Sequence, residues 1–496
     1  MNSYKFQSYI QNYREALKKI FEDPENHKKL SLNRELDADV LNMVMKYSPL
    51  NIFIPEEYNG MGGSTSQCLT TLEASSYESL PLSLLIGING ALFIQPVARY
   101  AEKNTQKNIL NRFSSEKSMG GLMITEPDFG SDALHMQTFF RKKNKGYHVK
   151  GVKHWAGLTG AADYWLLTAR EMSDDGKLGR DVGFFIHDSR NSGIEVAEYF
   201  NNLGLYLLPY GRNDINTWVP EDHRLRSPST GIKLMLDMLH RSRLQFPGMA
   251  MGFLKRIVDD ALHHVKSRQV GGRPLLEYDQ VKERIVRLQS YFTTCSAMCA
   301  FTSRHAPISK DLSGMDVPAN AIKSVITDMM HEASQSLLQL TGAQGYRLDH
   351  MAGRNIVDSR PFQIFEGSND ILYQQISESM IKKMRRTKVS SLKEFLINNE
   401  LTEKAADYVA GYMDFTLKQN LSQRKLVELG RILGFTISLD MVLRLGERGF
   451  KADLINNTIE ILKNDIKRSL VFVTDSVDRS PLDELENDTG WLNYTD

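Results

Sequence analysis

One carboxylate stands where it could act as a base toward carbon. Glu366 lies in the segment RPFQIFEGSNDI (residues 360–371), between an apolar pair and Gly367, just before a helix start. Partial loss of water raises the pKa of a carboxyl group and makes the carboxylate a stronger base toward a weakly acidic C–H bond. The alternative is a solvated or capping glutamate beside Ser368, which is itself a good N-cap for a helix that includes Asp370.

Two neighbouring segments could hold a flat, phosphate-bearing cofactor. The loop LMITEPDFGSD (residues 122–132) offers backbone N–H groups and the hydroxyls of Thr125 and Ser131. The segment KHWAG (residues 153–157) adds Trp155, an aromatic side chain that either stacks on a bound ring or fills the core of a sheet. An ordinary proline–glycine surface turn is the alternative for the loop.

Two arginines and a glycine-rich turn complete the set. Arg243 ends the segment LHRSR, and Arg268 follows 25 positions later. Guanidinium groups bind phosphates through paired hydrogen bonds, although most helical arginines are simply solvated. Glycines in the turn QLTGAQGY (residues 339–346) either let the backbone approach a phosphate or end a helix.

The elements that must position these residues change in character along the chain. The first residues indicate helices joined by loops, whereas 146–153, 164–168 and 182–186 have the composition of strands. After Pro228 an apolar stripe with helical spacing begins. The expected architecture is a multi-domain α+β protein with an N-terminal helical domain (1–118), a small, β-barrel-like middle domain (119–226), a C-terminal four-helix bundle (227–388) and a helical extension (389–496).

The expected extension contains three amphipathic stretches and an acidic tail. The stretches cover 392–418, 422–446 and 452–475, and the tail covers 483–488. We expect the extension to pack on the bundle and to contribute to a dimer. A role at a membrane surface is the alternative, because basic residues border one of its apolar faces: Lys451, Lys463, Lys467 and Arg468.

Composition argues against several classes of protein. The chain has 496 residues, 41% of them hydrophobic, and a net charge of +1. Such a chain can bury sizeable cores but has no broad field for nucleic acid or anionic lipid, so neither is an expected partner. Of its three cysteines, Cys295 and Cys299 are spaced like buried helical residues and lack further ligands nearby, so no metal is expected.

The N-terminal sequence predicts a cytoplasmic protein. It has neither the apolar core of a signal peptide nor the acid-poor character of a transit peptide. Residues 79–98 contain no ionisable side chain, but Pro81 and Pro96 interrupt them, which favours a buried helix over a membrane span. No integral membrane segment is expected.

The order of these regions, together with the five segments, resembles the FAD-dependent acyl-CoA dehydrogenase family, in particular its larger members with a C-terminal helical extension. The most specific likenesses are the loop at 122–132, similar to the family's Thr-Glu-Pro-x-x-Gly-Ser-Asp, and the segment around Glu366, similar to its Tyr-Glu-Gly-Thr. The resemblance implies dehydrogenation of an acyl thioester to a trans-2-enoyl thioester, in fatty acid or lipid metabolism. The thioester is carried by CoA or a carrier protein, and an electron-transfer flavoprotein accepts the electrons. It also implies a homo-dimer or homo-tetramer.

The resemblance also assigns roles to residues. Glu366 removes the α proton while hydride passes from the β carbon to flavin N5, and the thioester carbonyl accepts hydrogen bonds from the Glu366 N–H and a flavin ribityl hydroxyl. The implied FAD-binding residues are Leu122, Ile124, Thr125, Gly130, Ser131, Trp155, Gly157, Arg268, Gln339, Gly342, Ser368 and Asp370. The implied substrate-binding residues are Ser131, His240, Arg243 and Gly367.

Three positions depart from the family pattern. Gly157 replaces a threonine that contacts flavin N5, Gly271 replaces a phenylalanine, and Ala343 replaces a glycine. The first two keep an acyl-CoA oxidase or a flavin monooxygenase-type relative open as alternatives. A non-catalytic regulatory flavoprotein is a third possibility, because some relatives with C-terminal helical extensions are of that kind.

Overall fold

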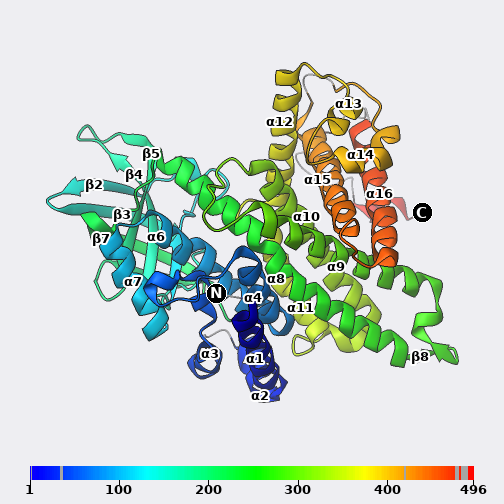
Figure 1. Cartoon of the computed structure of the whole chain (residues 1–496), viewed down its shortest axis with the longest axis horizontal. Helices are drawn as coiled ribbons and strands as arrows, with labels where there is room; N and C mark the ends of the chain where they lie inside the picture. The colour runs from blue at the N-terminus through cyan, green and yellow to red at the C-terminus, as the bar shows by residue number, and fades with distance from the viewer. Residues whose placement is uncertain (2, 34–36, 418–420, 475–479, 482–489, 496) are drawn as a thin grey trace.

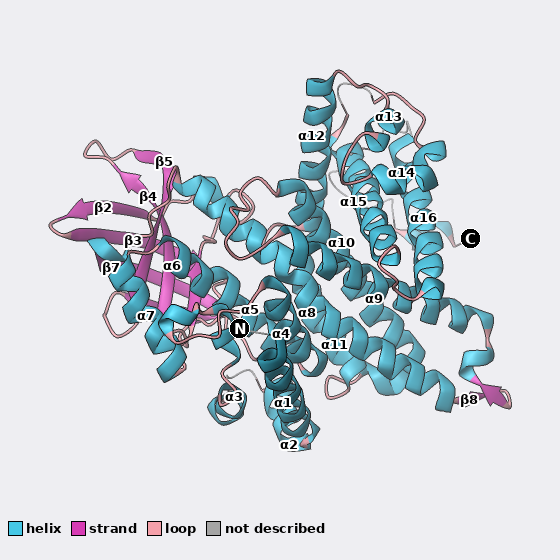
Figure 2. Cartoon of the chain, in the orientation of Figure 1, coloured by secondary structure: helices cyan, strands magenta, loops and turns pink. Residues whose placement is uncertain are grey.

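Four regions follow one another along the chain in the computed structural model (Figure 1). Figure 2 shows most of the strands gathered at one end of the molecule, a short hairpin at the opposite end, and helices elsewhere. The structure describes residues 1–496 except 2, 34–36, 418–420, 475–479, 482–489 and 496. The acidic tail expected at 483–488 therefore lies outside the described residues.

The N-terminal region is helical, as predicted. Its longest apolar run, Leu80–Tyr100, is long and apolar enough to cross a membrane, but it is entirely buried in the core. This confirms the buried helix expected from the sequence, with a π-helical turn at Ile88–Ile94. Asn89 in that turn accepts a hydrogen bond from the Gly120 N–H (2.7 Å) and so ties the helices to the first strand. The helices are α1 (Ser3–Glu22), α2 (Pro24–Leu32), α3 (Ala38–Met45), α4 (Thr65–Glu78), α5 (Leu80–Gly87), α6 (Gln95–Tyr100) and α7 (Lys103–Glu116).

The middle region is one seven-stranded sheet. Strands β1 and β2 lie one after the other along one side of β4, β5 pairs with its other side, and β3, β7 and β6 continue from β2. The sheet is curled, as the barrel-like prediction requires, and in the described part of the chain β5 and β6 do not pair to close it. The strands are β1 (Gly120–Met123), β2 (Phe139–Lys143), β3 (Gly146–His154), β4 (Tyr164–Met172), β5 (Leu178–Asp188), β6 (Ile194–Tyr199) and β7 (Gly211–Pro220).

The third region is the predicted helical bundle, built around α8. Its apolar stripe is buried at Leu254, Ile257, Ala261 and Val265, so the helical spacing is confirmed. Pro247 lies inside α8 and has no N–H for the helical hydrogen bond to the Arg243 carbonyl. The elements are α8 (Gly231–Ser267), a hairpin of β8 (Gln269–Val270) and β9 (Arg273–Pro274), α9 (Asp279–His305), α10 (Asp316–Thr341), α11 (Met351–Ser359) and α12 (Asn369–Thr387).

The C-terminal extension packs on the bundle. Helix α15 lies against α12 and α10, and α16 lies against α15 and α9 (Figure 1). The prediction of one continuous amphipathic stretch at 392–418 is wrong, because the Thr402 hydroxyl turns back to bond the Leu396 carbonyl (2.8 Å) and breaks it into two short helices. The elements are α13 (Leu392–Ile397), α14 (Glu403–Val409), α15 (Gln423–Gly446) and α16 (Ala452–Thr474).

Close packing between α15 and α12 depends on a glycine. A Cβ added at Gly430 would overlap the backbone carbonyl of Tyr373, whereas one added at Gly411 would meet nothing within 4 Å. Helix α15 can therefore approach the backbone of α12 only where it has no side chain.

We expect Gly430→Ala to destabilise the fold by about 1–3 kcal/mol, because the added methyl group must push α15 away from α12. Thermal unfolding followed by circular dichroism measures this, with Gly411→Ala as the control that should change stability by less than about 0.5 kcal/mol. Equal melting temperatures for the two variants would contradict the packing described here.

Candidate functional site

Glu366 sits in a tight turn between the 3-10 helix Arg360–Gln363 and α12. Its φ angle is +53° and that of Gly367 is +94°, so two successive residues adopt left-handed backbone conformations. A glycine accepts this conformation freely, whereas a glutamate needs neighbours that hold it there.

The carboxylate of Glu366 has two unequal oxygens. Ser242 on α8 donates a hydrogen bond to Oε1 (2.7 Å). The other oxygen, Oε2, is buried and has no partner among the described residues. Oε2 is therefore the oxygen available to a bound molecule.

Arg243 and Lys323 bind the backbone of the turn. Arg243 Nε donates to the Glu366 carbonyl (3.0 Å), and its Nη1 donates to Asn320 Oδ1 (2.7 Å). Lys323 Nζ on α10 donates to the Gly367 carbonyl (2.8 Å) and to Asn369 Oδ1 (2.9 Å). Two cations from two helices thus hold the two residues with positive φ.

Burial and charge compete at this turn. Burial raises the pKa of the Glu366 carboxyl above its usual range, while the Ser242 hydrogen bond and the charges of Arg243 and Lys323 lower it, and burial prevails. Lys323 is wholly buried, and burial, with the nearby Arg243 charge, lowers its pKa to about 7. The turn therefore places a carboxyl group of raised pKa beside two basic side chains, Arg243 and Lys323.

The backbone N–H of Glu366 makes no hydrogen bond within the part of the chain that the structure describes. A free N–H beside a basic carboxylate can donate to a carbonyl oxygen whose α proton the carboxylate removes. The turn is therefore suited to abstracting a proton next to a carbonyl group.

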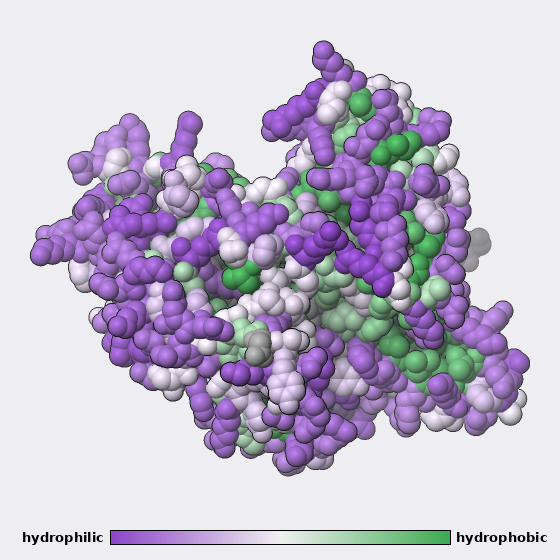
Figure 3. Space-filling view, viewed as in Figure 1, coloured by the Kyte–Doolittle hydropathy of each residue, from purple (hydrophilic) through white to green (hydrophobic). Residues whose placement is uncertain are grey.

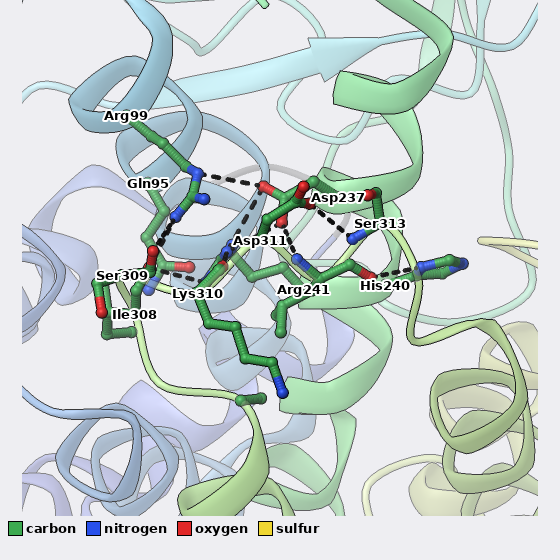
Figure 4. A network of polar contacts seen from close by, with 12 residues as sticks. Gln95, Arg99, Asp237, His240, Arg241, Ile308, Ser309, Lys310, Asp311 and Ser313 are labelled. Atoms are coloured by element: carbon green, nitrogen blue, oxygen red, sulfur yellow. Dashed lines mark hydrogen bonds and ion pairs between the residues drawn. The ribbon is translucent and has the colours of Figure 1, made fainter. Parts of the chain in front are cut away.

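Four consecutive polar residues of α8, His240 to Arg243, are all buried. His240 Nδ1 hydrogen-bonds the Leu312 carbonyl (2.8 Å), and Arg241 pairs with Asp237 (3.1 Å), as Figure 4 shows. Arg241 also donates to the Lys310 carbonyl (2.6 Å). In this structure His240 and Arg241 thus hold the loop before α10, and the substrate role expected for His240 stays a prediction.

A buried ion pair supports the loop at 122–132. Lys153 Nζ donates to Glu126 Oε1 (2.9 Å), to the Ile124 carbonyl (3.1 Å) and to Thr168 Oγ1 (3.1 Å). Glu126 in turn accepts the N–H groups of Gln137 (2.6 Å) and Thr138 (2.9 Å). Burial lowers the pKa of Lys153 to about 8, opposed by the Glu126 charge.

Five predicted cofactor residues belong to the segment 122–132 that contains Glu126. Leu122 is in β1, and the Thr125 carbonyl accepts the His154 N–H (2.9 Å), which joins the two predicted segments. Gly130 has open space around it, and Ser131 beside it is exposed. Ile124 takes part through its carbonyl bond to Lys153.

Trp155 presents a free aromatic surface. It has a positive φ of 57°, 54% of its side chain is exposed, and it contacts Phe200 and Tyr210. A large aromatic residue exposed and set at this backbone angle suits stacking on a flat ligand. At Gly157 an added Cβ would come within 2.9 Å of Ile88 Cδ1, so the smaller residue fits its surroundings.

Three of the predicted cofactor residues lie far from the Glu366 turn. Arg268 follows the last residue of α8, and because it is 25 residues beyond Arg243, the rise of a helix puts the two about 37 Å apart. Gln339 and Gly342 are at the end of α10 and are exposed. A single chain does not bring these residues to the Glu366 turn.

Ser368 and Asp370 begin α12. Ser368 takes the predicted N-cap position, but its side chain makes no capping hydrogen bond to the described helix. Asp370 pairs with Arg431 of the extension (2.9 Å). Their expected contacts with a cofactor remain predictions.

Sequence reasoning missed Ser242, Lys323, Asn369 and Asp328, all of which contact the turn or its flanks. Ser242 adjoins the predicted Arg243, and Lys323 is the one charged residue in a mostly apolar helix segment, AIKSVI. A lysine inside such a segment is the one signal that pointed to a buried charge.

Family models match most of the chain. The N-terminal, middle and C-terminal domains of acyl-CoA dehydrogenase match residues 10–117, 121–215 and 229–381. An acyl-CoA dehydrogenase of Bacillus subtilis (strain 168) is 24% identical over 352 residues, covering 70% of this chain and 90% of that protein.

Solved structures share the fold. An acyl-CoA dehydrogenase from Bacillus anthracis, complexed with FAD, has a TM-score of 0.78 at 16% identity and covers 97% of this chain and 89% of its own. Butyryl-CoA dehydrogenase from Megasphaera elsdenii has a TM-score of 0.66 at 18% identity and covers 75% of this chain and 98% of its own. The first match thus spans the C-terminal extension as well.

The hydrogen bond from Ser242 should lower the pKa of Glu366, because it stabilises the charged form. We expect Ser242→Ala to raise that pKa, so that the carboxylate infrared band forms at a higher pH. Difference infrared titration of each protein against its Glu366→Gln counterpart isolates the band. Ser290→Ala removes a buried hydroxyl that bonds only a helix carbonyl and serves as the control. An unchanged titration in Ser242→Ala would contradict this account.

Proposed function

Since the chain belongs to the acyl-CoA dehydrogenase family, we propose that it dehydrogenates the α,β bond of an acyl-CoA thioester, with Glu366 as the base. The observation that carries the proposal is the pairing of a buried carboxylate oxygen, Oε2, with the free N–H of the same residue. The substrate carbonyl and its α proton need such a pair of groups.

The cofactor in this proposal is FAD, which when bound accepts the hydride equivalent from the β carbon. The exposed ring of Trp155 and the open space at Gly130 fit a flat ligand with phosphates. The Lys153–Glu126 pair keeps the loop beneath them in place. At Gly157 we propose that a backbone N–H makes the contact that a threonine hydroxyl makes in relatives.

The protein's own residues carry the proton chemistry. Oε2 of Glu366 takes the α proton, and the Glu366 N–H stabilises the negative charge that develops on the carbonyl oxygen. Arg243 and Lys323 favour that charge through space and hold the carbonyls of Glu366 and Gly367. The raised pKa of Glu366 makes the carboxylate basic enough for a weakly acidic carbon.

An electron-transfer flavoprotein is the proposed electron acceptor, and CoA or a carrier protein the proposed carrier of the acyl group. Lipid metabolism is the proposed setting. These proposals rest on the family, whose members act on several kinds of acyl group: the relatives include isovaleryl-CoA and very long-chain acyl-CoA dehydrogenases.

We propose that a second copy of the chain completes the cofactor site. Arg268, Gln339 and Gly342 lie at the far end of the bundle, where Figure 3 shows apolar surface over the end of α9. Beside the β8–β9 hairpin, Val270 is exposed and Leu275 and Leu276 are half-buried. An apolar face lies next to these predicted cofactor residues, which are distant from the Glu366 turn of their own chain. This arrangement suits a homo-oligomer.

The base is tested by adding a panel of acyl-CoA thioesters to the FAD-loaded protein without oxygen and following the flavin absorbance. We expect bleaching by wild type and a loss of at least about 100-fold in its rate for Glu366→Gln, because general-base catalysis contributes about that much or more. Glu378→Gln is the control, because it changes an exposed glutamate whose hydrogen bond among the described residues is to Gln374.

The same experiment distinguishes the alternatives. Peroxide formed during turnover in air would indicate an oxidase, and a hydroxylated product a monooxygenase. Bound flavin that no thioester reduces would indicate a regulatory flavoprotein or a different carrier.

Sharing of the site between subunits has its own test. Arg268→Met and Glu366→Gln proteins should each be inactive alone, and unfolding and refolding them together should restore activity. A mixed dimer then contains one site with both native residues. Activity of Arg268→Met alone equal to wild type would overturn the shared site.

A further inference from the structure

One carboxylate accepts hydrogen bonds from both sides of the Glu366 turn. Oδ1 of Asp328 on α10 accepts the Gln363 side-chain amide (2.6 Å) and the Asn369 side-chain amide (2.7 Å). These residues lie three positions before and three positions after Glu366. Because Asn369 also accepts a hydrogen bond from Lys323, Asp328 acts on the same contacts that hold Gly367.

The second oxygen of Asp328 faces the C-terminal extension. Oδ2 accepts the Tyr373 hydroxyl (2.8 Å) and lies 3.6 Å from Nη1 of Arg431 on α15. The Arg431 guanidinium also lies over the Tyr373 ring, 4.8 Å from its centre. Its Nη2 bonds Asp370 (2.9 Å) in the first helical turn of α12.

Among the described residues, Arg431 is the basic side chain within ion-pairing distance of Asp328. Gln363, Asn369 and Tyr373 supply only neutral donors, so the carboxylate charge depends on Arg431 and, further off, on Lys323 for compensation. A partly buried carboxylate that loses its cation is strongly disfavoured and changes its contacts. Loss of Arg431 should therefore weaken the hydrogen bonds from Gln363 and Asn369 to Asp328, on either side of Glu366.

We infer that the C-terminal extension takes part in catalysis, with Arg431 as a positioning residue that acts through Asp328 and Asp370 on the Glu366 turn. The inference rests on the proposed function for its kinetic consequence and on the contacts alone for its structural one. Small displacements of a catalytic group cost large factors in rate, so a residue that touches no substrate can still limit turnover.

The extension has a second ionic anchor that provides a control. Arg287 on α9 binds Asp465 on α16 through two hydrogen bonds of 3.1 Å. Arg287 also bonds Tyr291, and none of its described contacts reaches residues 360–370. Removing this pair loosens the extension without touching the catalytic turn.

The kinetic test compares Arg431→Met with Arg287→Met in flavin reduction by the best acyl-CoA substrate. Arg431→Met should slow the maximal rate at least tenfold, with KM within about twofold of wild type, whereas Arg287→Met should keep the wild-type rate. Arg431→Lys retains the charge and should recover most of the loss. Equal rates in the two methionine variants would overturn the inference, and a wild type that no thioester reduces would instead overturn the proposed function.

A second measurement needs no substrate. The N–H groups of Ile364 and Phe365 bond the Pro361 carbonyl within the turn (2.9 and 3.0 Å), so their hydrogen exchange reports on its opening. Exchange in the peptide covering 361–370 should be at least fivefold faster in Arg431→Met than in wild type and unchanged in Arg287→Met. Unchanged exchange in Arg431→Met would overturn the structural part of the inference.

Discussion

The site depends on a glutamate held in a left-handed turn away from water. Such a backbone conformation costs about 1–3 kcal/mol for a residue other than glycine and persists only where surrounding structure over-determines it. Here Arg243 holds the Glu366 carbonyl, Lys323 holds the next one, and Asp328 holds both flanks. At this turn the Glu366 N–H and one of its carboxylate oxygens have no partner among the described residues.

This arrangement explains why two core helices carry charge. Helix α8 buries four consecutive polar residues and α10 buries Lys323, although polar groups inside a protein are costly unless they are paired. His240 and Arg241 bond the loop before α10 (Figure 4). Ser242, Arg243 and Lys323 bond the Glu366 turn. The apolar stripes pack the helices together, and the buried polar residues bind the Glu366 turn and the loop before α10.

The sequence was informative where a function depends on neighbours along the chain. The order of the regions, the strands and the segment around Glu366 all follow from local composition and spacing. Ser242, Asp328 and Arg431 were missed because their partners lie on other helices, and nothing in an amphipathic pattern distinguishes a solvated arginine from one that meets a buried carboxylate. The break within 392–418 was missed for a similar reason, since a threonine hydroxyl that bonds back to the Leu396 carbonyl leaves no periodic signal.

The close contact of Gly430 with the backbone of Tyr373 bears on the order in which the protein matures. During synthesis α12 leaves the ribosome before α15, so the face of α12 that α15 covers is first exposed to solvent and to chaperones. The turn that carries Glu366 can form its contacts with α8 and α10 at that stage, but not those with Arg431. The contacts between Arg431 and the Glu366 turn therefore form only after α15 has been made.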